Sequence, residues 1–323
     1  MISLLNLDPS SYVPSALHGP DRTFRETNCY VDIWIELLHA QSINPASIMA
    51  FACTADFEGD QWTFLKPPPE ELFRLYGIDV HEMQLYRPLL DHAVEQLTGG
   101  RTITVEVDSF YLPDTTATSY RRTHTKSSIA IEAVDVSGGR LRYFHNTGYY
   151  EVSGEDFDEL FRLRRNFSDD VLPPYVEIVR FDAGPRLEGL ELRRAVREMI
   201  GRQLARLPKR NPWSVFGERL GRDLPGLLRG TNNDYHAYAF ATVRQAGAAF
   251  ELLKSFVEWM GAPDSNCAAA ATGALERQVA GAKTMLFKLA RQRAFDPTPL
   301  VTELAADWDI TMRTMECLAR ATS

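Results

Sequence analysis

The sequence predicts an α+β fold in which a helix packs on an antiparallel sheet and a helical region follows. Short segments rich in β-branched and aromatic residues, separated by turn residues, dominate up to about residue 185. After a break at residues 182–185 that contains glycine and proline, apolar side chains recur at helical spacing to the end of the chain. We therefore expect two domains, an α+β domain at 1–185 and a helical domain at 186–323.

The expected elements follow from these patterns in chain order. The run at 29–41 is apolar on nearly every side, which indicates a buried helix, and further helices of the first domain are expected at 69–76, 85–98 and 155–164. Short or alternating apolar runs predict strands at 47–53, 61–65, 102–107, 124–134, 140–144 and 175–181. The second domain is expected to contain helices at 188–206, 212–229, 234–261, 266–293 and 297–319.

The composition limits the functional classes. The chain has 323 residues, 45% hydrophobic and 24% charged, which is ordinary for a soluble globular protein. It shows no signal peptide pattern and no apolar run of the length that a membrane span needs. A net charge of -8 argues against nucleic acid as the main partner. The four cysteines lie far apart without a Cys-x-x-Cys pair, so we expect no metal site, no disulfide framework and a cytoplasmic location.

Cys29 is the first candidate for chemistry, because it lies where a polar loop becomes the apolar helix at 29–41. Thr27 or Asn28 can cap this helix, and a thiol in the first turn feels the positive end of the helix dipole, which favours the thiolate. The alternative is a small core residue without a catalytic role. If Cys29 is a nucleophile, its backbone N–H and the Asn28 side chain are candidates to stabilise an oxyanion.

A thiol nucleophile needs a base, and His124 opens a predicted strand in a suitable setting. The next strand ends at Asn146, which is a candidate to hold the imidazole in the required tautomer. Asp135 and His145 are rivals for that orienting role. His124 can also be a solvated strand end, and Asn146 a turn residue that tolerates an unusual backbone angle.

The order of a cysteine at a helix start, a histidine at one strand and Asn or Asp at the next resembles papain-like proteins. More closely, residues 20–185 resemble the N-terminal domain of the butirosin-biosynthesis acyltransferase family, a branch of the papain-like cysteine peptidase fold. The matching pieces are the Asn28-Cys29 helix start, the stretch 107–113, the strands at His124 and before Asn146, and the helix start at 152–160. The family usually has Asp at the position of Asn146, and more glycine at 55–61.

The chain also resembles an uncharacterised bacterial group found beside genes for amino-acid:carrier-protein ligases. The family resemblance implies transfer of an acyl or aminoacyl group from the phosphopantetheine thioester of a carrier protein to a small amine. It implies a Cys29 thioester, a papain-like core and no bound cofactor other than the carrier's own phosphopantetheine arm. Two alternatives remain open: a cysteine peptidase or amidase that uses the same residues, and a binding module that kept the fold without the chemistry.

Two further sets of polar residues are candidates for substrate and partner binding. Asp108 and Tyr111 adjoin a loop that we expect to line the cleft, while Glu58 and Asp60 form an acidic loop that is suited to an amine or is a solvated turn. Residues 186–229 hold eleven basic and five acidic side chains, an excess suited to an acidic carrier protein. The candidates for carrier docking occupy one helical turn and are Arg193, Arg194 and Arg197. The alternative for this excess is a solvated helix face paired with acidic residues elsewhere.

Overall fold

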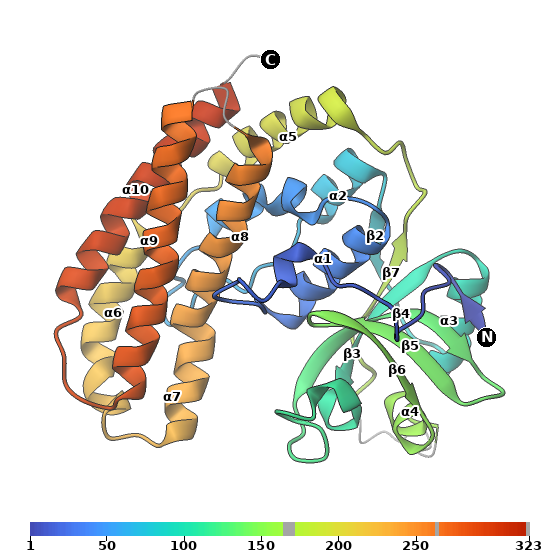
Figure 1. The fold of residues 1–323 in the computed structure, drawn as a ribbon. Coiled ribbons are helices and arrows are strands. Elements are labelled where there is room, and N and C mark those ends of the chain that lie inside the picture. The colour runs from blue at the N-terminus through green and yellow to red at the C-terminus, as the bar shows by residue number, and fades with distance from the viewer. Residues whose placement is uncertain (164–171, 262–264, 321–323) are drawn as a thin grey trace. The chain divides into compact units, whose positions relative to one another are not determined.

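The computed structural model describes residues 1–163, 172–261 and 265–320 (Figure 1). The chain forms two compact units, of which the first contains the strands and the second most of the helices. The first unit comprises residues 1–18, 29–45 and 72–186, and the second comprises 19–28, 46–71 and 187–323. The fold is therefore α+β with a C-terminal helical region. Two segments from the first half of the chain belong to the helical unit.

One antiparallel sheet forms the centre of the first unit. In the described residues its order is β2-β7-β3-β4-β5-β6, and β1 pairs with β4. The strands are β1 Ile2–Ser3, β2 Asp79–Glu82, β3 Thr102–Asp108, β4 Lys126–Asp135, β5 Arg140–His145, β6 Gly148–Ser153 and β7 Val176–Arg180. Long antiparallel pairing of β3, β4 and β5 fixes the register, so the face on which a side chain lies follows from alternation along the strand, except at the irregularity between Ile131 and Ala133 of β4.

Helices cover both faces of this sheet. α3 (Leu89–Thr98) and α4 (Glu155–Leu160) pack with strand residues such as Ile129 and Tyr143 in one apolar core. α1 (Cys29–Ala40) contacts β4, β5 and β6, and its first residue lies beside Ser128, which alternates with Ile129. α1 therefore lies on the opposite face of the sheet from α3 and α4.

A buried polar cluster joins α1 to the N-terminal segment of the same unit. Glu36, fully buried on α1, accepts hydrogen bonds from the Tyr12 hydroxyl at 2.5 Å and from the Ser15 backbone N–H at 3.1 Å. His18 contacts Glu36 through Nδ1, and its Nε2 lies 3.5 Å from Asp32. Buried charges are stable only when paired, so the helix depends on the N-terminal segment for its polar side.

The second unit is a set of helices with well-defined ends. They are α5 Gly189–Leu204, α6 Pro212–Leu227, α7 Asn232–Ala239, α8 Gln245–Met260, α9 Ser265–Ala290 and α10 Thr298–Arg320, while the division between the units at 71/72 falls within α2 (Pro69–Tyr76). Asn211 caps α6 with Pro212 in its first turn, and Thr231 forms a capping box with Asp234 at the start of α7. Within the described residues, no helix combines the length and apolar character that crossing a bilayer requires.

Most expected elements are present, with four differences. Residues 47–53 were expected as a strand, but Pro45–Thr54 is a 3-10 helix; a short apolar run cannot be told from a buried helix by periodicity. The expected strand at 61–65 is reduced to a single bridge between Phe57 and Trp62, because Trp62 packs among aromatic rings of the helical unit. Strands β1, β2 and β6 were not expected. The helix expected at 234–261 is interrupted by a π-helical turn at Phe240–Arg244.

Candidate functional site

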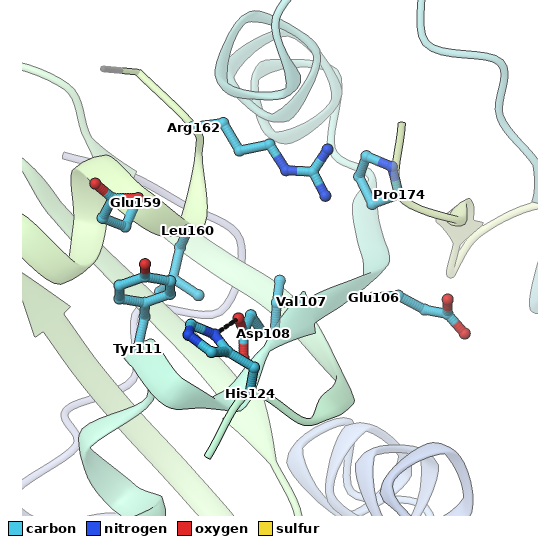
Figure 2. Close-up of a pocket in the computed structure, with 9 residues that line it drawn as sticks. All are labelled: Glu106, Val107, Asp108, Tyr111, His124, Glu159, Leu160, Arg162 and Pro174. Atoms are coloured by element: carbon cyan, nitrogen blue, oxygen red, sulfur yellow. Dashed lines mark hydrogen bonds and ion pairs between the residues drawn. The ribbon is translucent and has the colours of Figure 1, made fainter. Parts of the chain in front are cut away.

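The first unit contains an open pocket of about 190 Å³ where β3 ends (Figure 2). Its walls come from β3, from the segment that follows it, from α4 and from the approach to β7. The lining residues are Glu106, Val107, Asp108, Tyr111, His124, Glu159, Leu160, Arg162 and Pro174. Three residues that the sequence singled out, Asp108, Tyr111 and His124, are therefore brought together here.

His124 and Asp108 form a hydrogen-bonded pair in this pocket. His124 Nδ1 lies 2.5 Å from Asp108 Oδ2 (Figure 2). The imidazole ring also stacks on Phe110, with ring centroids 4.4 Å apart. The other carboxylate oxygen of Asp108 accepts the backbone N–H groups of Phe110 at 3.0 Å and Thr125 at 3.2 Å. The carboxylate is thus fixed, and it favours the tautomer with a proton on Nδ1. Among the described residues no hydrogen bond occupies Nε2, which can then accept a proton from a bound molecule.

Charged side chains around the pair make the pocket suitable for a polar ligand with a cationic group. Glu106, Asp108 and Glu159 contribute carboxylates to its lining. Glu106 forms an ion pair with Lys126 at 2.8 Å, and the Arg162 guanidinium donates to a backbone carbonyl at 2.8 Å. Lys126 and Arg162 therefore both have partners, while Asp108 holds the imidazole.

Cys29 is the first residue of α1, as expected, and its thiol is partly exposed. Its Sγ lies 3.7 Å from the hydroxyl of Ser128 on β4. Neither residue lines the pocket, and no hydrogen bond between Cys29 and His124 is present in the described residues. Burial raises the pKa of the Cys53 thiol to about 12, so that thiol is unreactive at neutral pH.

The orienting partner of His124 is Asp108 and not Asn146. Asn146 occupies the turn between β5 and β6 with φ of 44°, the left-handed conformation that asparagine tolerates better than most residues. This corresponds to the turn alternative. Asp108 was expected to contact substrate. Sequence order did not identify it as the orienting residue, because its proximity to His124 arises from the pairing of β3 with β4.

Asn28 and the acidic loop residues belong to the second unit, whereas Cys29 belongs to the first. The Asn28 amide donates to the Leu65 carbonyl at 3.1 Å, so one of its donors already has a partner. Glu58 and Asp60 are exposed in the turn between Phe57 and Trp62. Their surroundings match a solvated turn. No group of three or more potential metal ligands occurs among the described residues.

The arginines proposed for carrier docking differ in their contacts. Arg193 donates to the carbonyls of Trp259 at 3.3 Å and Met260 at 2.8 Å, and its guanidinium lies 4.9 Å from the Trp259 ring centroid. It therefore stabilises the C-terminal end of α8, where a positive charge is favourable. Arg194 is exposed, and Arg197 is half-buried. Other members of the basic excess also have partners within their own unit, such as Arg202, which binds the Glu71 carboxylate with two hydrogen bonds.

A second histidine–aspartate pair lies on the α3 and α4 side of the sheet. His145 Nδ1 lies 2.5 Å from Asp114 Oδ2, and His145 Nε2 lies 2.7 Å from the Ser127 hydroxyl. The Tyr143 hydroxyl donates to the other Asp114 oxygen at 2.6 Å. From the sequence, His145 is only an alternative to Asn146 as the residue that orients His124. No signal in the sequence indicated Ser127 or Asp114, because strand pairing and the turn at Pro113–Thr115 bring them together.

Family comparisons divide the chain in nearly the same place as its composition does. The DUF1839 N-terminal domain matches residues 13–181, and the DUF1839 C-terminal domain matches residues 189–317. No curated protein matches the chain. Because the two matches together cover most of its length, the chain belongs to the DUF1839 family.

Proposed function

We propose that the protein transfers an acyl or aminoacyl group from a carrier-protein thioester to a small amine bound in the pocket. The observation that carries the proposal is the His124–Asp108 pair, which leaves Nε2 available inside a pocket with further carboxylates. An amine enters as an ammonium ion and must lose its protons before it can form an amide. A histidine whose other nitrogen is held by a carboxylate is suited to take up that proton.

In the proposed reaction the amine nitrogen attacks the thioester carbonyl while His124 Nε2 accepts a proton. The N–C bond forms, the C–S bond breaks, and the thiol leaves with a proton. The Glu159 carboxylate attracts the ammonium group, and Tyr111 contributes an aromatic wall. The acyl group reaches the amine either directly from the carrier or by way of a thioester on Cys29.

A Cys29 thioester is supported by the position of the thiol at the start of a helix that packs on an antiparallel sheet. On this arrangement we base the proposal of a papain-like core and of a reaction like that of the butirosin-type acyltransferases. The pantetheine arm would come with the carrier protein. For docking we propose the exposed Arg194 rather than Arg193, because Arg193 is committed to the end of α8.

The test uses acyl and aminoacyl thioesters of pantetheine with a panel of small amines, and amide formation is measured by mass spectrometry. His124→Ala should lower the rate by about 10²- to 10⁴-fold, the usual contribution of a general base. Asp108→Asn should lower it less. The matched control is His81→Ala, since His81 forms an exposed pair with Asp79 at 2.9 Å but does not line the pocket. Full activity in His124→Ala, or no amide from any amine, would refute the proposal.

Cys29→Ser separates the two routes in the same assay. Loss of turnover, together with an acyl adduct on Cys29 in the native protein, indicates a thioester intermediate. Unchanged turnover indicates direct transfer.

A second candidate function is amine binding without chemistry, which is favoured by the contact of Cys29 with Ser128 rather than with an imidazole. In that case calorimetry detects amine binding that His124→Ala weakens, and no amide forms.

A further inference from the structure

We propose that Ser127 is an activated nucleophile that accepts acyl groups from esters or thioesters, with His145 as its base and Asp114 as the residue that positions His145. The Ser127 hydroxyl lies 2.7 Å from His145 Nε2, and His145 Nδ1 lies 2.5 Å from Asp114 Oδ2. This is the connectivity of a serine–histidine–aspartate triad, in which each group is recognised by its contacts and not by its position in the sequence. The proposal does not require the transfer reaction at His124.

The environment of Asp114 fixes the direction of each hydrogen bond. Burial, and then the neighbouring Asp114 charge, raise the pKa of Tyr143 well above its ordinary value, so its hydroxyl stays protonated and donates to Asp114 Oδ1 at 2.6 Å. The second carboxylate oxygen is then the acceptor for His145 Nδ1–H. With the proton on Nδ1, Nε2 is the acceptor for the Ser127 hydroxyl. The chain of hydrogen bonds therefore polarises the serine O–H toward the imidazole.

Strand pairing places Ser127 beside the pocket. Ser127 pairs directly with Val107 of β3, and directly paired residues of antiparallel strands lie on the same face of the sheet. Val107 and Leu160 both line the pocket and belong to the core that α4 covers. Ser127 is 8% exposed, whereas the His145 side chain is 1% exposed. The serine is thus more exposed than its histidine and is paired with a residue of the pocket wall.

The step itself balances without any other reactant. Ser127 Oγ bonds to the acyl carbon as its proton moves to His145 Nε2. The bond from carbon to the leaving oxygen or sulfur then breaks, and the proton passes from His145 to that leaving group. Water or an amine takes the acyl group in a second step of the same form. A structural role, in which the same contacts only anchor the turn at Pro113–Thr115 to the sheet, would give no reaction at Ser127.

A fluorophosphonate probe distinguishes these roles, since it reacts with activated serines by forming an O–P bond and releasing fluoride. The folded native protein should form one adduct, which peptide mass spectrometry locates at Ser127, and Ser127→Ala should abolish it. Ser128→Ala is the matched control: Ser128 is the next residue, lies on the opposite face of the sheet, and should leave labelling unchanged. No adduct at Ser127 in the native protein overturns the proposal, as does equal labelling of the urea-unfolded chain.

Asp114→Asn tests the positioning role through the pH profile of labelling. In the native protein labelling should already be fast at neutral pH and should rise little above it. The asparagine favours the wrong tautomer, so labelling at neutral pH should fall by about 10²- to 10⁴-fold and continue to rise with pH as hydroxide replaces the base. A variant that keeps its melting temperature and the native pH profile would show that Asp114 is structural. These measurements use no amine acceptor, so their failure is distinct from failure of the transfer reaction.

Discussion

Replacing His18 by glutamine should remove a pH dependence of stability that operates between about pH 6.5 and 9. Burial of the ring by itself lowers the pKa of His18. The hydrogen bonds to Asp32 and Glu36 on α1, together with their charges, outweigh burial and raise the pKa from 6.5 to about 9. The Tyr12 hydroxyl also faces Glu36 and remains protonated, because burial raises the pKa of Tyr12 far above this range.

The sign of this pH dependence follows from the proton affinity of His18, which is greater in the folded state than in the unfolded state. The charged imidazole stabilises the fold fully below pH 6.5, and this contribution is lost as the pH rises through about 9. A shift of one pKa unit corresponds to about 1.36 kcal/mol. The rise in the pKa of His18 from 6.5 to about 9 therefore corresponds to about 3 kcal/mol of unfolding free energy. His18→Gln also leaves Glu36 with fewer donors, so the variant should be less stable than the native protein at low pH, and the difference should shrink as the pH rises.

Urea unfolding, followed by circular dichroism at a series of pH values from about 6 to 9.5, measures this difference. His39→Gln is the matched control, because His39 lies on the same helix, where its Nε2 lies 3.1 Å from the Val13 carbonyl and its ring stands edge-on to Tyr12 with centroids 6.3 Å apart. That variant should keep the native pH dependence. If the difference in stability between the native protein and His18→Gln is the same at every pH, folding does not raise the pKa of His18 and the reasoning is wrong.

Three further predictions concern a thiol, a helix end and a turn. Limited iodoacetamide treatment should label Cys29 before Cys53, whose thiol is buried, and peptide mass spectrometry that finds the opposite order would exclude a reactive Cys29. Arg193→Glu should lower the unfolding free energy by about 1–3 kcal/mol through loss of the contacts at the end of α8, whereas the exposed Arg194→Glu should change it by less than about 0.5 kcal/mol in urea melts. Gly77→Ala should cost about 2 kcal/mol or more, because φ is 65° and the added carbon meets a backbone carbonyl; a melting temperature equal to the native value would contradict this.

The sequence predicts a helix or strand well where its apolar residues recur at a clear spacing. The helix expected at 29–41 is present as α1, and the strands at 102–107 and 140–144 are present within one residue of the expected ends. The strand expected at 47–53 is wrong, because a short run that is buried on all sides has no periodicity to distinguish a strand from a helix. β6 follows a two-residue turn at Asn146, for which the sequence offered both an orienting role and a turn role but did not predict the strand that follows.

The candidate site was predictable in part. His124, Asp108 and Tyr111 were each singled out, and they line one pocket. Their roles depend on distances that only strand register determines: Asp108 reaches His124 because β3 pairs with β4, and no spacing in the sequence encodes that contact. The same limit explains why the charge count at 186–229 did not reveal that Arg193 binds backbone carbonyls within its own unit.

The way in which the chain alternates between the two units affects how the protein can be divided and how it can have evolved. The chain passes from one unit to the other five times, at 18/19, 28/29, 45/46, 71/72 and 186/187. A fragment that ends at residue 186 would keep the segments 19–28 and 46–71 without the helices they belong with, and would expose Trp62 and Phe57 to water. Such a fragment should be insoluble when expressed alone and be recovered by co-expression with residues 187–323. For the same reason, neither half can be exchanged for an unrelated domain by a single recombination event, so the two halves are expected to be inherited together.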